Sequence, residues 1–317
     1  MAALAFIPCP VIRYRQKAKV IAMKKRLAAL LLLCCLLPPG ARGEELPAYS
    51  VTQRKTHTVY DTETLKYTIE KCTLVNHPTS TGKAVKTACY VTKVWVREPA
   101  RQIKKAISPW HEAIWKAENI AKQIDGAALV INGSGYVSER YPEIPENYPG
   151  VSEDYYCTPL GSIAVVDGEV KRNLEGVPYY GLTLEEDGLH MYVGADNEAV
   201  LARHPLQTWS FYEGCPMALN GEDILDHDWA FARRRAIRTV IAKLTEENTY
   251  LILTTGDTGL TLLEANAFLL GEYDTAWIYD LDGGPSSALM RRLQGKKTLK
   301  VLHPAKQRIV DVMGFIE

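Results

Sequence analysis

An acidic, glycine-rich turn at residues 280–287 carries the side chains best suited to chemistry. It reads Asp-Leu-Asp-Gly-Gly-Pro-Ser-Ser and follows an apolar run at residues 276–279 that predicts a strand. Two glycines let backbone N–H groups approach a ligand, and Pro285 suits the first turn of a helix. Because amides at a helix start carry partial positive charge, such a turn can bind phosphate, with Ser286 and Ser287 adding hydroxyl donors. A tight strand-to-helix turn capped by Asp and Ser explains the same residues equally well.

Three more polar residues lie at the ends of predicted strands. Asn132 follows the apolar run at residues 127–131, which is typical of a strand buried on both faces. Arg238 lies near the start of a strand predicted at residues 236–243, and its guanidinium offers the bidentate, permanent charge that a phosphate needs. Asp257 lies in a glycine-flanked loop. The plainer alternatives are a solvated strand end for Arg238 and an ordinary loop acid for Asp257.

These segments follow one another in the order of a known family. Residues 279–287 resemble the N-L-D-G-G-G-S-S signature of the phosphodiester glycosidases. Residues 131–136 are similar to the N-G-G-Y/F motif of that family, and residues 238–242 are similar to its R-T-A-I-G motif. Residues 255–262 are similar to its G-x-T-L loop and helix start. Pro285 departs from the pattern, because it replaces the third glycine and removes one backbone N–H.

The resemblance implies hydrolysis of a sugar-1-phosphodiester at the anomeric C–O bond. Phosphate is a good leaving group, so the site must hold the phosphodiester and stabilise an oxocarbenium-like sugar, with one carboxylate as base or nucleophile. Asp282 is predicted to be that carboxylate and Asp257 its partner, while Asn132 orients substrate or water. The residues predicted to bind substrate are Arg238, Thr258, Gly259, Gly283, Gly284, Ser286 and Ser287.

The surrounding pattern predicts an α+β fold, with mixed β-sheets flanked by a few helices. Residues 44–104 are predicted to form a strand-rich N-terminal portion, and residues 105–317 the phosphodiester glycosidase-like catalytic domain. A helix is predicted at residues 108–124, where Ser and Pro open a stripe of apolar residues at helical spacing. Thr261 and Glu264 form a capping box that starts a second helix.

Turn chemistry divides the rest of the catalytic portion. Three Asp-Gly or Asn-Gly pairs, at residues 167–168, 187–188 and 220–221, predict hairpins. The stretch at residues 141–158 is rich in Pro, Tyr and acids and predicts a long loop, of the kind that often covers a binding site. Aromatic residues at positions 209, 211 and 212 form either a platform for a sugar or a packed strand edge.

Residues 1–43 have the order of a secretory signal. The basic segment at residues 23–26 precedes an apolar run at residues 27–37, and a small-x-small pattern ends at Gly43. The run has about 11 residues, whereas a spanning helix needs about 20. The sequence therefore predicts a protein that is secreted or held in the cell envelope, with no stable membrane span, and Met23 itself starts a complete signal.

Composition limits the partners. Lys+Arg and Asp+Glu are both 37, so no global field favours nucleic acid, and an anionic ligand must be held by a local site. The expected partner is a phosphorylated glycan or a sugar-1-phosphodiester. No Cys/His spacing indicates a metal site, and no cofactor is predicted. A divalent cation at the phosphate is left open by the sequence, without residues that support it. The absence of G-x-S-x-G, Walker and Rossmann motifs argues against serine esterase, NTPase and dinucleotide enzymes.

Two questions stay open at this stage. A non-catalytic envelope protein that binds phosphorylated polysaccharide, for its assembly or anchoring, would need the same phosphate cradle as the enzyme. Four cysteines follow the signal, at positions 72, 89, 157 and 215, and Cys72 and Cys89 lie in neighbouring predicted strands. They form either a disulfide across a hairpin or free thiols.

Overall fold

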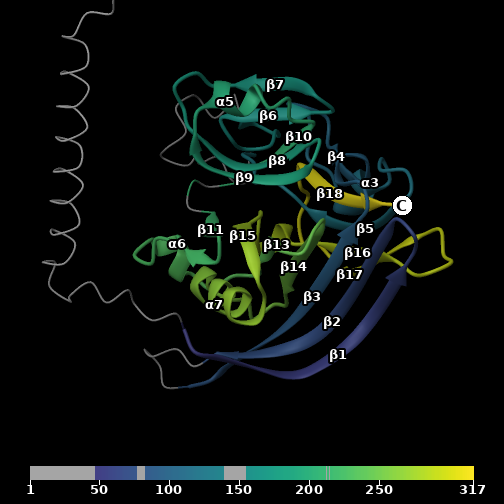
Figure 1. The fold of residues 1–317 in the computed structure, drawn as a ribbon, viewed down its shortest axis with the longest axis vertical. Helices are drawn as coiled ribbons and strands as arrows, with labels where there is room; N and C mark the ends of the chain where they lie inside the picture. Colours follow the sequence, from purple (N-terminus) through teal and green to yellow (C-terminus); the bar gives the residue numbers. More distant parts are fainter. Residues whose placement is uncertain (1–46, 77–82, 139–154, 212, 214) are drawn as a thin grey trace, which may run out of the picture. The chain divides into compact units, whose positions relative to one another are not determined.

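The computed structural model describes residues 47–76, 83–138, 155–211, 213 and 215–317, which belong to one compact unit. The predicted signal peptide and most of the predicted loop at residues 141–158 lie outside these residues. Strands dominate the part of the chain that is described, with eighteen strands in four sheets and five short α helices (Figure 1). No helix among these residues has the length and apolar character needed to cross a membrane.

The largest sheet has eight strands and combines the first three strands of the described chain with strands from its second half. The strand-rich N-terminal portion supplies three long strands, and the third, β3 (Val85–Val96), pairs through residues 89–95 with the whole of β14 (Thr249–Thr255) (Figure 1). In spatial order the strands are β1 (Tyr49–Asp61), β2 (Leu65–Asn76), β3 (Val85–Val96), β14 (Thr249–Thr255), β13 (Thr239–Leu244), β15 (Thr275–Asp280), β11 (Pro216–Leu219) and β12 (Glu222–Asp223).

A five-stranded sheet faces the large sheet, and two smaller sheets complete the fold. The five-stranded sheet runs β17 (Leu299–His303), β16 (Leu289–Arg292), β5 (Ala127–Asn132), β18 (Asp311–Ile316) and β4 (Ile103–Ile107). The smaller sheets are β10 (Gln207–Trp209), β8 (Tyr179–Glu185) and β9 (Gly188–Ala195), and the pair β6 (Ile163–Val166) and β7 (Glu169–Asn173). The helices are α2 (Pro99–Gln102), α3 (Ala117–Ala121), α5 (Asn197–Leu201), α6 (Ala230–Arg233) and α7 (Leu262–Glu272).

Every ladder between these strands is antiparallel, so the expectation of mixed sheets is wrong for the described residues. The reason lies in the connections, because tight hairpins join antiparallel neighbours whereas parallel neighbours need long crossovers. The predicted hairpin pairs are confirmed between β6 and β7, β8 and β9, and β11 and β12. Asp167 and Asn220 have φ of +50° and +53° and are each followed by a glycine with positive φ, as two-residue hairpin turns require.

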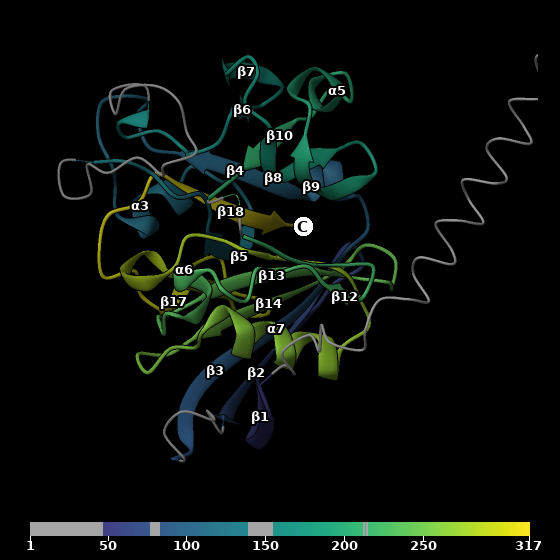
Figure 2. The same ribbon diagram turned by 90° about the vertical axis from the view of Figure 1, so that its left-hand side faces the viewer.

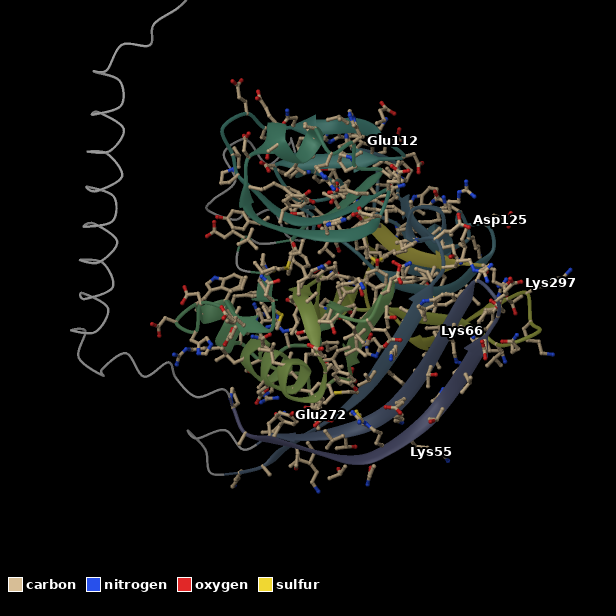
Figure 3. The ribbon with its side chains drawn as sticks, in the orientation of Figure 1. Lys55, Lys66, Glu112, Asp125, Glu272 and Lys297 are labelled. Atoms are coloured by element: carbon tan, nitrogen blue, oxygen red, sulfur yellow. The ribbon has the colours of Figure 1, made fainter. Side chains whose placement is uncertain are left out.

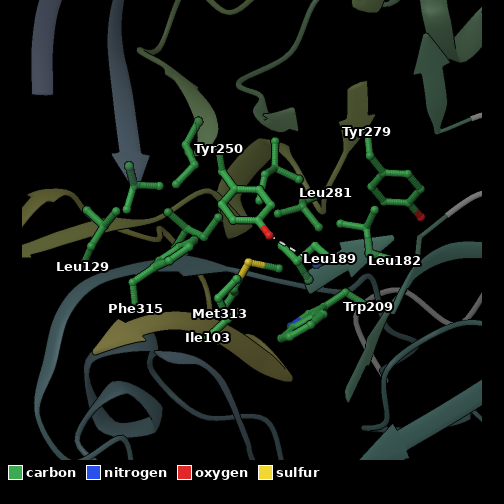
Figure 4. Close-up of a cluster of buried hydrophobic side chains, with 14 of the residues drawn as sticks. Ile103, Leu129, Leu182, Leu189, Trp209, Tyr250, Tyr279, Leu281, Met313 and Phe315 are labelled. Atoms are coloured by element: carbon green, nitrogen blue, oxygen red, sulfur yellow. Dashed lines mark hydrogen bonds between the residues drawn. The ribbon is translucent and has the colours of Figure 1, made fainter. Parts of the chain in front are cut away.

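Side chains from the two large sheets meet in the main hydrophobic core. Tyr250 and Leu281 on one side pack with Leu129, Met313 and Phe315 on the other (Figure 4). The buried Tyr250 hydroxyl accepts a hydrogen bond from the Leu189 N–H at 3.2 Å, which ties β9 to this core (Figure 4). β5 is buried along its entire length, as its continuous apolar run predicts.

Helix α7 covers the opposite face of the eight-stranded sheet (Figure 2). Its start is the predicted capping box, in which Glu264 N donates to Thr261 Oγ1 at 3.1 Å and Thr261 N donates to the Glu264 carboxylate at 2.9 Å. Charged side chains such as Lys55, Lys66 and Glu272 point outward from this part of the fold (Figure 3). The order of layers is therefore helix, large sheet and facing sheet, which places the ends of β5, β13 and β15 together between the two sheets.

The helix predicted at residues 108–124 forms only as α3, at residues 117–121. Ser108 instead continues the β4 ladder, because its N–H and its hydroxyl both donate to the Val310 carbonyl, at 2.7 and 2.8 Å. His111 has φ of +60°, which an α helix excludes, and Trp115 pairs with Ile309. Pairing with a distant strand thus outweighs a local helix-start signal.

Cys72 and Cys89 are direct partners in the ladder between β2 and β3, as expected for neighbouring strands. Both are buried free thiols, and so are Cys157 and Cys215.

Candidate active site

A pocket of about 230 Å³ opens beside the acidic turn. Strand β15 ends at Asp280, and the chain then turns through Asp282 into a short 3-10 helix at Gly284–Ser286. The pocket lining combines this turn with aromatic side chains, arginines and one amide: Tyr136, Leu160, Phe211, Phe231, Arg234, Ala236, Arg238, Asp282, Gly283, Gly284, Pro285 and Gln307.

Asp282 is the one carboxyl in this lining among the described residues, and it is 9% exposed. The pKa of Asp282 is raised to about 8, chiefly by burial, and the negative charges of Asp280 and Asp311 contribute to the rise. Hydrogen bonds from Ser286 and from the Gly283 N–H act in the opposite direction. At neutral pH the side chain is therefore mainly a carboxylic acid, whereas the sequence predicts a carboxylate.

The backbone amides of the turn do not form a free phosphate cradle. The N–H of Asp282 donates to the Gly133 carbonyl at 3.0 Å, and that of Gly284 donates to the Ile237 carbonyl at 2.7 Å. The N–H groups of Ser286 and Ser287 donate to Gly283 and Gly284 within the turn. These groups hold the turn in shape, so an anion in the pocket must find its donors on side chains.

Asn132 lies behind the turn rather than in the pocket lining. Its Nδ2 donates to the Asp282 carbonyl at 2.5 Å, while its Oδ1 accepts from Thr239 Oγ1 at 2.8 Å and from the Ala288 N–H at 2.9 Å. The side chain is 1% exposed. Asn132 thus joins the ends of β5, β13 and the acidic turn, and it fixes the backbone that presents Asp282.

Arg238 lines the pocket, but most of its donors are used inside the protein. Nε donates to the Leu260 carbonyl, and Nη2 donates to the carbonyls of Phe231 and Arg234. Nη1 lies 3.3 Å from Asp280 Oδ2, and both side chains are buried. Since a guanidinium has five N–H groups, these four bonds leave one for any ligand.

Arg234, the middle one of three consecutive arginines at residues 233–235, has the opposite character. It is exposed, lines the pocket, and has no side-chain partner among the described residues. Its neighbours are occupied, because Arg233 binds the His227 carbonyl and Asp228, while Arg235 binds the Gly259 carbonyl and Glu264. Arg234 is therefore the cation that the pocket offers to an anion.

The other predicted residues fall into two groups. Gly283, Gly284 and the buried Ser286 and Ser287 belong to the turn beside the pocket. Asp257, Thr258 and Gly259 lie outside the lining. Asp257 is exposed and pairs with Lys306 at 2.7 Å, an interaction that lowers its pKa, and Thr258 is also exposed. Gly259 has φ of +67° and its carbonyl binds Thr87 and Arg235, so its role is structural.

Aromatic residues form one wall of the pocket. Phe211 and Phe231 lie with ring centroids 5.8 Å apart, and Arg238 Cζ lies 4.7 Å from the Phe231 centroid. The Tyr136 hydroxyl donates to the Arg308 carbonyl at 2.6 Å, which fixes its ring. Trp209 belongs to the core, and Tyr212 lies outside the described residues. Of the two described members of the aromatic cluster noted in the sequence, Phe211 lines the pocket and Trp209 does not.

Three further residues lie near the acidic turn, and no motif in the sequence predicts them: Gln307, Lys105 and Asp311. Gln307 Nε2 donates to Ser286 Oγ at 2.6 Å on the pocket side of the turn. Lys105 and Asp311 form a fully buried ion pair at 2.7 Å behind Asn132 and Gly133. Only their position in the folded chain brings them near Asp282.

Comparison with known proteins gives a match to one family and a shared fold. The sequence profile described as phosphodiester glycosidase matches residues 125–315. No curated protein matched the chain significantly. Among solved structures, the catalytic domain of zebrafish N-acetylglucosamine-1-phosphodiester alpha-N-acetylglucosaminidase, auto-inhibited by its pro-peptide, is similar with a TM-score of 0.59. The identity is 16%, over 85% of this chain and 88% of that one. A hypothetical protein from Synechocystis gives a TM-score of 0.45 at 13% identity, over 86% of this chain and 72% of that one.

Proposed function

This chain belongs to the phosphodiester glycosidase family, and from that premise we propose that it is an exported hydrolase that cleaves glycosyl-1-phosphodiesters in cell-surface or extracellular carbohydrate. One observation supports this function above the others. Among the described residues, the pocket combines a single, largely protonated carboxyl, Asp282, with an exposed arginine that has no side-chain partner, Arg234. A phosphodiester carries one negative charge, and its glycosidic bond needs one acid, so the two groups match the substrate.

In the proposed complex, Arg234 binds the non-bridging phosphate oxygens and the remaining Arg238 N–H supports them. Guanidinium suits this task because its planar donors match a phosphate bidentately. The sugar lies against Phe211 and Phe231, whose rings provide an apolar surface for its C–H face. This arrangement places the anomeric C–O bond toward the acidic turn.

The chemistry then uses Asp282 twice. With a pKa of about 8, its carboxyl is mainly protonated at pH 7. As the anomeric C–O bond breaks, the Asp282 proton passes to the departing phosphate oxygen and leaves a phosphomonoester. The carboxylate so formed takes a proton from a water molecule while the water oxygen bonds to the oxocarbenium-like carbon, which restores the acid.

The place of action is proposed from the sequence alone. A basic segment, a short apolar run and a small-x-small pattern at residues 23–43 support export. The balanced net charge is in keeping with a neutral or weakly anionic glycan substrate that is bound locally.

The decisive experiment assays the purified protein against a panel of sugar-1-phosphodiesters that differ in sugar and in the alcohol esterified to phosphate. We expect release of free sugar and phosphomonoester, with and without a chelator. Asp282→Asn should abolish turnover while binding of the substrate persists in calorimetry. Binding of phosphorylated polysaccharide without turnover in the wild-type protein would instead support the non-catalytic envelope role.

A further inference from the structure

A buried ion pair lies directly behind the acidic turn. Lys105 on β4 and Asp311 at the start of β18 place Nζ and Oδ2 2.7 Å apart, and both side chains are inaccessible to solvent. Lys105 Nζ also donates to the Thr208 carbonyl and lies 5.4 Å from the centroid of the Trp209 ring. A buried ion pair contributes little net stability, because the cost of desolvating both charges offsets most of their attraction.

The Asp311 carboxylate grips the loop that follows β5. Its Oδ1 accepts from the Ser134 N–H at 2.6 Å, and its Oδ2 accepts from the Ser134 hydroxyl at 2.8 Å. The Gly133 N–H donates to the Asp311 carbonyl at 3.2 Å. A Cβ atom at Gly133 would lie 2.3 Å from Asp311 Oδ1, so the close approach depends on glycine. The carboxylate is held in one orientation by Lys105 and Ser134 together.

The same loop holds Asp282 on its other side. The Gly133 carbonyl accepts the Asp282 N–H at 3.0 Å, and Asn132 donates to the Asp282 carbonyl. The peptide between Gly133 and Ser134 therefore lies between Asp311 and Asp282. Movement of Asp311 would be transmitted to the acidic turn through two hydrogen-bonded peptide groups.

We propose that Lys105 and Asp311 are a positioning pair for Asp282, acting through the Gly133–Ser134 peptide. The kinetic part of this inference rests on the proposed function. Neither residue touches the substrate, since both lie outside the pocket lining. Together they hold the acidic turn in place. Asp311 also keeps a negative charge, balanced by Lys105, near the Asp282 carboxyl.

Charged groups on the neighbouring elements determine in which direction the pKa of Asp282 is shifted. Asp280 on β15 is paired with Arg238 on β13, and Asp311 is paired with Lys105. Asp282 itself has no cationic partner in the salt bridges of the described residues. The negative charges of Asp280 and Asp311 both favour the protonated form of Asp282, and the Ser286 and Gly283 donors favour the charged form. Arg234 lines the same pocket and also favours the charged form.

The test compares Asp311→Asn, and the double variant Asp311→Asn with Lys105→Met, against wild type. The titration of Asp282 is read from the pH dependence of urea unfolding, as the difference between each protein and its own Asp282→Asn derivative. Loss of the Asp311 charge should move that titration to lower pH, by about half a unit or more in the single variant and by less in the double variant. The kcat for a sugar-1-phosphodiester should fall about tenfold at similar KM.

A matched control is available at Glu185, whose buried carboxylate pairs with Arg203 at 2.9 Å and lies outside the pocket. Glu185→Gln should lower stability without moving the Asp282 titration or kcat. The inference is overturned if the Asp311 variants behave like Glu185→Gln. If they do not fold, Ser134→Ala removes one bond to Asp311 and no charge, and a wild-type kcat in that variant overturns the inference as well. Absence of any turnover in wild type would defeat the proposed function, while the titration still decides the positioning role.

Discussion

Arg238 Nη1 lies 3.3 Å from Asp280 Oδ2 in the wall of the pocket, and both side chains are buried. Burial raises the pKa of Asp280 to about 7, and the charge of Arg238 opposes that rise. The pair is therefore interdependent, because each charge is tolerated only beside the other. Because most of its donors are bound within the protein, Arg238 holds strands β13 and β15 together and has little capacity left to bind a substrate phosphate.

The first prediction is that Arg238→Met destabilises the protein rather than specifically weakening substrate binding. It leaves Asp280 and three carbonyl groups without their donor, which should cost about 3–5 kcal/mol of unfolding free energy. Urea denaturation at pH 7 measures the change. Arg238→Met combined with Asp280→Asn should recover part of the loss, since no unpaired charge is left. If the Arg238→Met variant is as stable as wild type but has a much higher KM, the main role of Arg238 is to bind the substrate phosphate.

The second prediction concerns Asp282 and pH. Its folded pKa of about 8 exceeds the ordinary aspartate pKa of 3.8, so the native state holds this proton more tightly than the unfolded chain. The resulting contribution to stability is complete below pH 3.8 and is lost as pH rises through 8. Asp282→Asn removes the ionisable group, so for each pH unit between pH 3.8 and pH 8 the variant should gain about 1.4 kcal/mol of unfolding free energy relative to wild type, with no further gain above pH 8. If the unfolding free energy of the two proteins depends on pH in the same way, the pKa of Asp282 is not raised.

The third prediction assigns phosphate recognition to Arg234. Arg234→Gln should raise KM for a sugar-1-phosphodiester by about 10–100-fold, because a charge-assisted contact is worth about 1.5–3 kcal/mol. Steady-state kinetics at low and at high salt would show that the wild-type KM rises with salt and that the variant depends on it less. Arg233→Gln is the matched control, since Arg233 is bound to Asp228 and lies outside the pocket lining. Similar kinetics for the two variants would exclude Arg234 as the anion site.

Local signals in the sequence predicted local structure well. The capping box at Thr261 and the glycine hairpins formed as expected, because the few residues of each motif satisfy its own hydrogen bonds or turn geometry. The helix start predicted at Ser108 failed, because Ser108 pairs with the distant Val310 instead. The apolar run that became β5 was also clear, since only a fully buried strand lacks any polar face. The acidic turn was correctly placed at the end of β15.

What the sequence could not supply were partners that lie far along the chain. Arg238 and Arg234 are equally charged, and only the fold shows that the first is paired with Asp280 while the second lines the pocket without a side-chain partner in the described part of the chain. The glycine turn was expected to offer its amides to phosphate, yet carbonyls of residues 133 and 237 take two of them. The protonated state of Asp282 has the same origin, because it follows from burial and from two distant acids.

The fourth prediction removes Asp257 from the catalytic set. Its carboxylate is exposed, lies outside the pocket lining and is paired with Lys306. Asp257→Asn should therefore keep kcat and KM within about twofold of wild type, since exposed ion pairs contribute little. The comparison is made on the same substrate and at the same pH as for Asp282→Asn. A hundredfold loss of kcat would mean that this loop closes over the substrate.

The fifth prediction tests how Asn132 presents the acidic turn. Asn132→Ala leaves the Ala288 N–H and the Thr239 hydroxyl without their acceptor and releases the Asp282 carbonyl. Two or three buried polar groups without partners should cost about 2–5 kcal/mol of unfolding free energy. Because Asp282 would also lose a fixed position, kcat should fall by about 100-fold, measured at a temperature where the variant is still folded.

Asn266→Ala is the matched control for that experiment. Asn266 is a buried asparagine on α7 that donates to the Met217 carbonyl and to Asp223, and it lies outside the pocket lining. Its replacement should lower stability by a comparable amount and leave kcat close to wild type, since it has no bond to the acidic turn. If both variants lose kcat in proportion to stability, Asn132 supports the fold in general. A loss of kcat confined to Asn132→Ala means that the Asn132 amide specifically holds Asp282 in its reactive position.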